Sequence, residues 1–330
     1  MLSNGRRIGA HLPLGDGMVK AADRAATIDA SAIQVFTDNP TSWRRRRGLP
    51  AELPAFRDRL AAHGVAPMSV HAPYLVNLAG PDQALVEKSV VVLLHELRVA
   101  AEYGAAFVNI HIGSHRGDGP EAGTTRLAAG LGEVFAALGD DAPGITVVLE
   151  NGSGGGFGLG SRIEELAAID VAVRAAGVEP GRFGYCLDTA HLWGAGYPID
   201  TAAGVDATIG AFDGAIGLER LRMVHVNDSR SAQGSREDRH EHVGAGRIGA
   251  AGLARMLVHP DLGGVVYILE TPGMEEGYDA VNLARARDLV EGRPLAALPP
   301  EAFHTRSAKG RSAPAEATAA ETDEPDREEG

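Results

Sequence analysis

The stretch VEKSVVVLLHELRVAAEYGAAFVNIHI, residues 86–112, contains one unit of the fold that we predict for the whole chain. A helix-like pattern runs up to Gly104, and glycine suits the left-handed position at which many helices end. A short apolar run with β-branched residues follows and ends at His111. A helix followed directly by a buried strand is typical of α/β proteins with a parallel sheet.

The same alternation recurs from residue 6 to about residue 292. The strand-like runs are RIGAHL, AIQVFT, MSVHAP, FVNIHI, TVVLEN, FGYCLD, RMVHVN and VVYILET. Helix-like stretches between them include GMVKAADRAATID, RIEELAAIDVAVRAAG and YDAVNLARARDLVEG. Strands separated by helices imply parallel pairing through crossovers. Eight such units favour an α/β fold of the (β/α)₈ TIM-barrel type over the alternative, an open doubly wound sheet.

The composition divides the chain into two parts. Residues 1–295 should form the barrel, since the alternating pattern runs to about residue 292, just before this boundary. The C-terminal part, residues 296–330, includes the stretch SAPAEATAAETDEPDREEG, which is rich in Ala, Pro and acidic residues. Such a composition cannot bury enough apolar surface to fold. We therefore expect an acidic, disordered tail from residue 296.

Charge and cysteine content limit the classes of function. The net charge of −13 argues weakly against a protein that coats nucleic acid through bulk charge, but it permits a local cationic site. No window approaches the roughly 18 apolar residues of a membrane helix, and the N-terminus lacks a signal-peptide pattern. Cys186 is the only cysteine, so no intrachain disulfide can form. These features predict a cytoplasmic protein without membrane contact.

Polar side chains gather where a barrel places its active site. In a (β/α)₈ barrel the chemistry lies at the C-terminal ends of the strands. His, Asp and Glu residues follow the strand-like runs at these positions: His71, His111, Glu150, Asp188, His191, His225, Asp238, His240 and Glu270. A single histidine at a strand end is usually structural, but nine such residues on one face indicate a common site.

Divalent metal ions explain this gathering best. Without cations, the four carboxylates would repel one another and several imidazoles would lack partners, at a large desolvation cost. Imidazole and carboxylate donors favour zinc, and manganese or iron also accept them. One ion cannot use nine ligands, whereas two or three can if a carboxylate bridges a pair. A multinuclear site of this kind suits phosphodiester hydrolysis.

With these residues in place, the chain resembles endonuclease IV (deoxyribonuclease IV), the apurinic/apyrimidinic endonucleases of the xylose-isomerase-like barrel superfamily. The matching motifs are IGAHLPLGDG, FTDNPTSW, HAPYLVNLAGPD, NIHIGSH, VVLENGSGGG, CLDTAHLWGAGY, HVNDS, GSREDRHEHVGAG and ILETP. The resemblance implies a zinc-dependent, monomeric enzyme of base excision DNA repair. It would act on double-stranded DNA with abasic sites or blocked 3′ ends, and would cut on the 5′ side of an abasic site to leave a 3′-hydroxyl.

The resemblance also implies three zinc ions, with Glu150 as bridging and catalytic residue and with manganese or iron as alternatives at one position. The implied ligand sets are His71, His111 and Glu150 for one ion, then Glu150, Asp188, His225 and Glu270, then His191, Asp238 and His240. His242 is outside the set and is interpreted as a loop or supporting residue.

DNA contacts are expected from three residues. Tyr74 and Leu75 match two positions that the family inserts into the helix at the abasic site. Arg239 lies between Asp238 and His240, which face one side of an extended segment, so it should face away toward a phosphate or an acidic neighbour. Thr41 stands where some members carry an arginine. The run RRRR at 44–47 either replaces that contact in part or is a solvated turn.

Two rival functions stay open. A sugar isomerase or epimerase of the same barrel type would bind one ion through Glu150, Asp188, His225 and Glu270, leaving the other five residues unexplained. A non-enzymatic metal-binding protein would bind ions without turnover.

Overall fold

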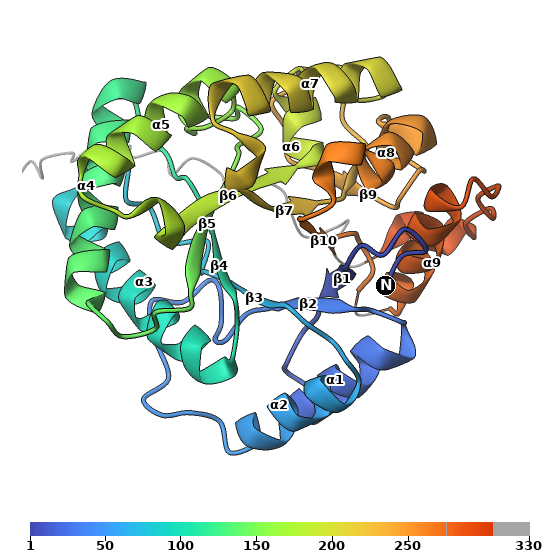
Figure 1. Cartoon of the computed structure of the whole chain (residues 1–330), viewed down its shortest axis with the longest axis horizontal. Coiled ribbons are helices and arrows are strands. Elements are labelled where there is room, and N and C mark those ends of the chain that lie inside the picture. Colours follow the sequence, from blue (N-terminus) through green and yellow to red (C-terminus); the bar gives the residue numbers. More distant parts are fainter. Residues whose placement is uncertain (275, 306–330) are drawn as a thin grey trace, which may run out of the picture.

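The computed structural model describes residues 1–274 and 276–305, and it shows a closed barrel of eight parallel strands inside a ring of helices (Figure 1). Each predicted strand-like run overlaps one of the barrel strands: β1 (Ile8–His11), β2 (Ala32–Val35), β3 (Met68–His71), β4 (Phe107–His111), β5 (Thr146–Glu150), β6 (Phe183–Asp188), β7 (Leu221–His225) and β10 (Val266–Leu269). Seven of the runs contain their strand entirely, whereas β7 begins one residue before its run. Strand β1 pairs with both β2 and β10, which closes the sheet and excludes the open alternative. The predicted TIM barrel is confirmed.

The helices cover the outside of the barrel (Figure 1). They are α1 (Met18–Thr27), α2 (Leu53–Ala62), α3 (Gln83–Tyr103), α4 (Pro120–Leu138), α5 (Ile163–Ala175), α7 (Ala202–Ala215), α8 (Gly249–Val258) and α9 (Tyr278–Val290). Helix α3 begins where the Asp82 side chain accepts a hydrogen bond from the Leu85 amide, and it ends at Gly104, which has φ 74° as its sequence predicts. Within the described ranges, no helix is long and apolar enough to cross a membrane.

Shorter elements lie in the loops. Helix α6 (Thr189–Gly194) follows β6 without a gap, and the loop after β7 contains an antiparallel hairpin of β8 (Asp228–Ser229) and β9 (His240–Glu241). Single 3₁₀ turns occur at Pro180–Arg182, Leu218–Arg220, Pro260–Leu262 and Pro300–His304. Helix α6 and the hairpin both lie beyond the C-terminal ends of their strands, which is where a barrel carries its chemistry.

The inside of the barrel is a packed core. Val148, Cys186, Met223 and Ile268 are fully buried within it and form a hydrophobic cluster with Ala32 and Val266. A larger apolar cluster fills the space between the strands and the surrounding helices. This part of the barrel interior is apolar, whereas the predicted site residues lie at or beyond the C-terminal ends of the strands.

The beginning of the C-terminal segment differs from its prediction. Pro300–His304 form a 3₁₀ turn, and Ala302 and Thr305 are buried. The carbonyl oxygen of Ala302 lies 2.8 Å from Nε2 of His242. Residues 296–305 therefore pack on the barrel instead of beginning a disordered tail, because His242 and its neighbours offer a buried surface that composition does not reveal. The predicted disorder of residues 306–330 lies outside the described residues.

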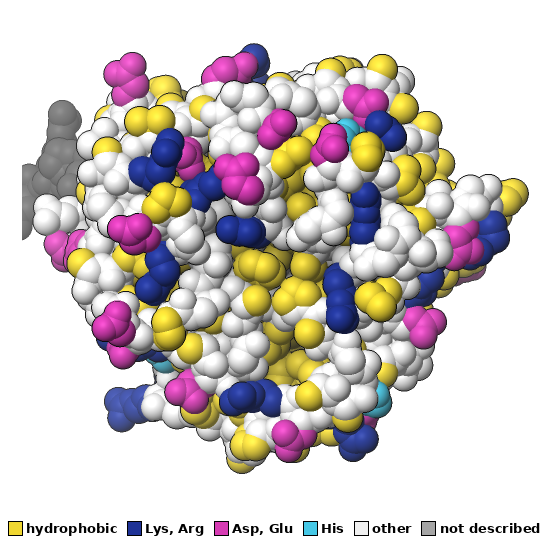
Figure 2. All heavy atoms as spheres, viewed as in Figure 1, with side chains coloured by type: hydrophobic (Ala, Val, Ile, Leu, Met, Phe, Trp, Pro, Cys, Tyr) yellow, Lys and Arg dark blue, Asp and Glu magenta, His cyan; other side chains and the backbone are white. Residues whose placement is uncertain are grey.

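Charges of opposite sign are mixed on the face drawn in Figure 2, where Lys and Arg side chains alternate with Asp and Glu side chains. That face has no continuous basic area, in agreement with the net charge of −13. This face therefore offers no broad basic surface that would attract an anion.

Candidate metal centre

The nine predicted residues converge at the C-terminal end of the barrel. His71, His111, Glu150, Asp188 and His225 are each the last residue of their strand. Glu270 follows the last residue of β10, and His191 lies in α6. Asp238 and His240 come from the hairpin loop, in which His240 begins β9. Parallel strands end at one rim of the barrel, so residues far apart in the sequence become neighbours.

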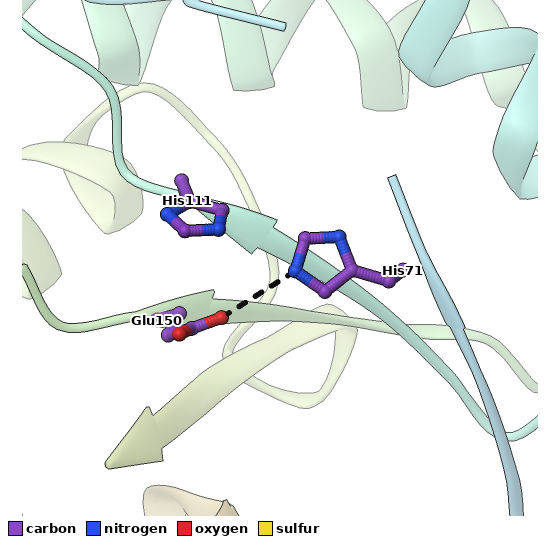
Figure 3. Close-up of side chains that lie close together, drawn as sticks. All are labelled: His71, His111 and Glu150. Carbon is purple, nitrogen blue, oxygen red and sulfur yellow. Dashed lines mark ion pairs between the residues drawn. The ribbon is translucent and has the colours of Figure 1, made fainter. Parts of the chain in front are cut away.

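A first group joins three adjacent strands (Figure 3). His71, His111 and Glu150 each offer a ligand atom, and these atoms lie within 4.8 Å of one another. The Nε2 atom of His71 lies 3.7 Å from Oε2 of Glu150. His111 and Glu150 are register partners in the β4–β5 pair, which fixes their side chains on the same side of the sheet. The group could hold one metal ion.

A second group surrounds the ring of His225. Its Nδ1 atom lies 3.5 Å from Glu150 Oε1, 3.4 Å from Glu270 Oε2 and 3.8 Å from Asp188 Oδ2. This nitrogen is buried and has no hydrogen-bond partner. Three carboxylates that face one buried imidazole nitrogen call for a cation between them.

A third group uses the hairpin loop. Asp188, His191 and His240 offer ligand atoms within 4.8 Å of one another. Asp238 is also close, since its Oδ1 lies 3.0 Å from His240 Nε2 and its Oδ2 lies 3.4 Å from His191 Nε2. Nε2 of His240 is also buried, and the Asp238 contact does not have the geometry of a hydrogen bond. The structure thus adds Asp188 to the three residues predicted here, and this carboxylate lies between the second and third groups.

The imidazole rings are oriented by their other nitrogens. Nδ1 of His71, His191 and His240 lies 2.7, 2.8 and 2.8 Å from the carbonyl oxygens of Ala72, Asn151 and Glu270, respectively. A carbonyl oxygen only accepts, so these Nδ1 atoms carry the proton and the Nε2 lone pairs face the centre. His225 is reversed, because its Nε2 faces Oε1 of Gln34 at 3.3 Å and leaves Nδ1 for the centre. Metal-binding histidines are typically held in this way.

Three buried amides hold the carboxylates. Asn109 Nδ2 donates to Glu150 Oε2 at 2.5 Å, Asn227 Nδ2 to Asp188 Oδ2 at 2.6 Å, and Gln34 Nε2 to Glu270 Oε1 at 2.6 Å. The sequence-based prediction missed these residues, together with His11, whose Nδ1 lies 3.3 Å from Glu270 Oε1. The available signal was a single amide inside an apolar strand run, as in AIQVFT and FVNIHI.

The electrostatics of the groups favour positive charge at the centre. Burial alone lowers the pKa of His191 and His240, but Asp188 and Asp238 outweigh it, so the pKa of His191 is well above its usual value and that of His240 is raised to about 9. Against its own burial, His225 and His111 hold the pKa of Glu150 well below its usual value. By contrast, burial lowers the pKa of His111. The Glu150 carboxylate is thus favoured in its ionised form, which attracts cations.

The donor set fits divalent ions such as zinc. It consists of imidazole nitrogens and carboxylate oxygens, and its free ring nitrogens are already oriented toward the centre. The unpartnered Nδ1 of His225 and Nε2 of His240 are buried atoms that a metal ion would satisfy. The residues present could therefore hold divalent ions of the kind that the sequence predicts.

A groove of about 780 Å³ opens beside the first group, and both predicted DNA-inserting residues line it. The Tyr74 side chain is 44% exposed, and its ring centre lies 5.6 Å from that of His71 and 5.9 Å from that of His111. Leu75 is half-buried, and Arg116 lines the same groove.

The other predicted contact residues are spread around the site. Arg239 is exposed, and its Nε lies 3.6 Å from Oε2 of Glu237, an acidic neighbour as expected. In the basic run, Arg45 forms a 3.0 Å ion pair with the buried Glu96. This arginine is therefore neither a replacement DNA contact nor part of a solvated turn, the two alternatives considered for the run. Arg44 and Arg47 are exposed, as is Thr41.

His242 lies outside the three groups. It is fully buried, and its ring bonds to Asn282 and to the carbonyl oxygen of Ala302. It therefore supports the loop that carries Asp238 and His240, as the sequence interpretation proposed for a residue outside the ligand set.

Comparison with known proteins places this fold and site in a class. A model of the xylose isomerase-like TIM barrel family matches residues 22–292. A protein of Methanoculleus marisnigri named probable endonuclease 4 is 38% identical over 283 residues, covering 86% of this chain and 98% of that one. Its counterpart in Halorhodospira halophila is 40% identical over 271 residues, covering 82% and 90%.

Comparison with solved structures gives the same family and fold. The crystal structure of endonuclease IV from Thermus thermophilus has a TM-score of 0.73 and 39% sequence identity, covering 87% of this chain and 99% of that one. A D-tagatose 3-epimerase-like protein has a TM-score of 0.62 at 17% identity, a likeness of fold alone. The protein is thus a xylose isomerase-like TIM barrel. Within that class, the chain belongs to the endonuclease IV family, as its motifs predicted.

Proposed function

We propose that the protein is a zinc-dependent apurinic/apyrimidinic endonuclease that hydrolyses the phosphodiester bond on the 5′ side of an abasic site and leaves a 3′-hydroxyl. As a member of the endonuclease IV family, it is a hydrolase of phosphodiester bonds. The observation that carries the proposal is the convergence of all nine predicted residues on one end of the barrel, in groups that share Glu150 and Asp188.

The bridging role assigned to Glu150 is supported by its two oxygens. Oε1 lies 3.3 Å from His191 Nδ1 and 3.5 Å from His225 Nδ1, whereas Oε2 faces His71 at 3.7 Å. One carboxylate therefore reaches the first and second groups at once, and a residue with this position can belong to two ions. Asn109 donates to Oε2 and keeps the carboxylate from rotating away.

The ligand set also explains how an acidic chain would attract DNA. Three divalent ions against four carboxylates leave a formal charge of about +2 with neutral imidazoles. When bound, such ions activate water for attack on phosphorus and stabilise the attacking and leaving oxygens. Several candidate ligands line the groove and would hold this charge there, and Arg116, which also lines it, is placed for a further phosphate contact.

Recognition is proposed to depend on a gap in the DNA. A nucleotide without its base costs little to unstack, so an enzyme that opens the helix there gains selectivity. Tyr74 and Leu75 line the groove next to the first group and are the side chains expected to fill the gap. Duplexes with abasic sites or blocked 3′ ends are the proposed substrates. A monomeric state and a cytoplasmic location stay predictions.

The sugar isomerase hypothesis uses only the second group, Glu150, Asp188, His225 and Glu270. It leaves five converging residues without a role, two of which bring a loop across the barrel to the same centre. The endonuclease hypothesis uses all of them. A non-enzymatic metal-binding protein would use them as well, and turnover is what separates it from the proposal.

The test combines metal analysis with cleavage. We expect purified protein to contain about three zinc ions per chain and to cut a duplex with one abasic site, leaving a 3′-hydroxyl. Glu150→Gln should abolish cleavage, because an amide has only one oxygen to offer as a ligand. Glu241→Gln is the matched control, since Glu241 adjoins His240 but belongs to no group. A single metal ion per chain with full activity, or near-normal turnover by Glu150→Gln, would refute the proposal.

A further inference from the structure

The Gln34 side chain occupies an unexpected place. Strand β2 contributes none of the nine proposed ligands, yet Gln34 on this strand is fully buried and reaches residues of β7 and of the β10 end. Its Nε2 donates to Glu270 Oε1 at 2.6 Å, and its Oε1 faces His225 Nε2 at 3.3 Å. One amide thus touches two members of the second group. We propose that Gln34 is a positioning residue that orients both His225 and Glu270 toward one metal ion.

The hydrogen-bond partners determine which way the amide points. An ionised carboxylate only accepts, so the atom that faces Glu270 must be the amide nitrogen. The amide oxygen therefore faces His225, and it requires a proton on Nε2 of that ring. With the proton there, the lone pair on Nδ1 points at Glu150, Asp188 and Glu270, which is the orientation that a ligand needs.

His225 depends on a side chain, whereas three of the other four imidazoles depend on the backbone. His71, His191 and His240 are held by carbonyl oxygens, which no substitution removes. For His225, the partner of Nε2 is the Gln34 amide. A single side-chain substitution can therefore remove the partner of this ring, whereas the partners of His71, His191 and His240 belong to the backbone.

His11 contacts the Gln34 amide, and Phe36 in turn packs on His11. Nδ1 of His11 lies 3.2 Å from Gln34 Nε2 and 3.3 Å from Glu270 Oε1. The ring of Phe36 packs on His11 with 4.4 Å between ring centres. These contacts hold the Gln34 amide in a defined position. Oε1 of Glu270 accepts a hydrogen bond from this amide, whereas Oε2 faces Nδ1 of His225 at the centre.

This inference rests on the proposed function, since it requires the second group to bind metal. Gln34→Leu removes both ends of the amide and should weaken the binding of one of the three ions by about 10- to 100-fold, the usual effect of losing such a supporting contact. The other two ions should bind as in the wild type. Ser69→Ala is the control, because Ser69 is the buried register partner of Gln34 on β3 and its hydroxyl has no hydrogen-bond partner.

The experiment titrates metal-stripped protein with zinc in competition with a chelating indicator, and repeats the titration with cobalt(II) to follow the ligand-field spectrum of the affected ion. Gln34→Met, which has a flexible side chain of similar length, serves if Gln34→Leu does not fold. Unchanged binding of all three ions would overturn the inference. Equal weakening of all three, with a matching loss of stability in the stripped protein, would make Gln34 merely structural and overturn it too. A wild type without three ions would refute the proposed function itself, and this inference with it.

Discussion

Asp238 and His240 are two residues apart, and their side chains meet within 3.0 Å because an extended segment places alternate side chains on one side. If they complete an ion site with His191, Asp238→Asn should remove about one zinc ion per chain and severely reduce cleavage of an abasic duplex. Elemental analysis and a cleavage assay on the same preparation measure both. The neighbouring Glu237→Gln, in an exposed residue outside the groups, is the control.

If the protein were a single-ion isomerase, Asp238→Asn should change metal content and activity little, since the four ligands of that ion are intact. If the loop were merely solvated, the same result is expected, because exposed substitutions usually alter stability by roughly 0.5 kcal/mol or less. Full zinc content in the variant would therefore speak against the third ion. The Asp238 side chain is 35% exposed, so the substitution itself should not unfold the barrel.

Tyr74 is the residue whose substitution should weaken DNA binding without changing the metal content. Its exposed ring stands against His71 and His111 but contributes no ligand atom to their group. Tyr74→Ala should weaken the binding of an abasic duplex, by about 1–3 kcal/mol if the ring stacks on a base, and leave the zinc content unchanged. Tyr74→Phe keeps the ring and should bind nearly as the wild type does. Equal affinities of all three proteins in a fluorescence titration would place the inserted side chain elsewhere.

At the scale of elements, the loop between β7 and α8 is supported by the C-terminal 3₁₀ turn. His242, two residues beyond His240, bonds to the carbonyl oxygen of Ala302, and its ring lies against that of Phe303. The same segment approaches the loop after β10, where a Cβ added at Gly273 would lie 2.9 Å from the Thr305 methyl group. The turn thus touches both loops that follow the last two barrel strands, and the family match ends before it, at residue 292.

This contact predicts an effect of Ala302→Asp. A carboxylate cannot remain at a position that is 1% exposed, so the turn should detach and leave Nε2 of His242 without its partner. We expect a loss of about 1–3 kcal/mol in unfolding free energy, measured by urea denaturation, and faster release of zinc to a chelator. His304→Asp introduces the same carboxylate on an exposed residue of the same turn and should have little effect. Identical unfolding curves for the two variants would show that the turn does not support the loop.

Some elements of the fold can be predicted from local sequence patterns, and others cannot. The eight strands were predictable because each is an apolar run of the length a buried parallel strand requires, and the Gly104 helix end because glycine tolerates its φ of 74°. Six of the nine candidate ligands could be located because strand ends are defined once the strands are, whereas His191, Asp238 and His240 lie in α6 and in the hairpin loop. Gln34 was visible as an amide in a strand, but its partners lie 191 and 236 residues away, and no local pattern specifies them. The turn at Pro300–His304 depends equally on distant contacts.

At the scale of the whole molecule, the centre exists only when the barrel is closed. Its residues come from six barrel strands or the segments that follow them, between His71 and Glu270, and neighbouring groups share Glu150 and Asp188. Bound ions would therefore connect strands that are distant in sequence. Metal binding to such a site adds to the stability of the folded state, because the unfolded chain cannot assemble the ligands.

Protons and metal ions should compete for this centre. In protein stripped of metal, burial lowers the pKa of His240, but Asp238 and Asp188 outweigh burial and raise this pKa from 6.5 to about 9. The folded state therefore holds this proton more tightly than the unfolded state, and its stabilising effect is complete below pH 6.5 and is lost as the pH rises toward 9. Zinc requires the neutral ring, so its binding expels the proton and strengthens over the same interval. We expect the difference in Tm between zinc-loaded and stripped protein to widen from pH 6.5 to 9. Thermal unfolding at several pH values measures it, and His240→Gln should flatten the dependence. A difference that is constant or narrows with rising pH would contradict the assignment of His240 as a ligand.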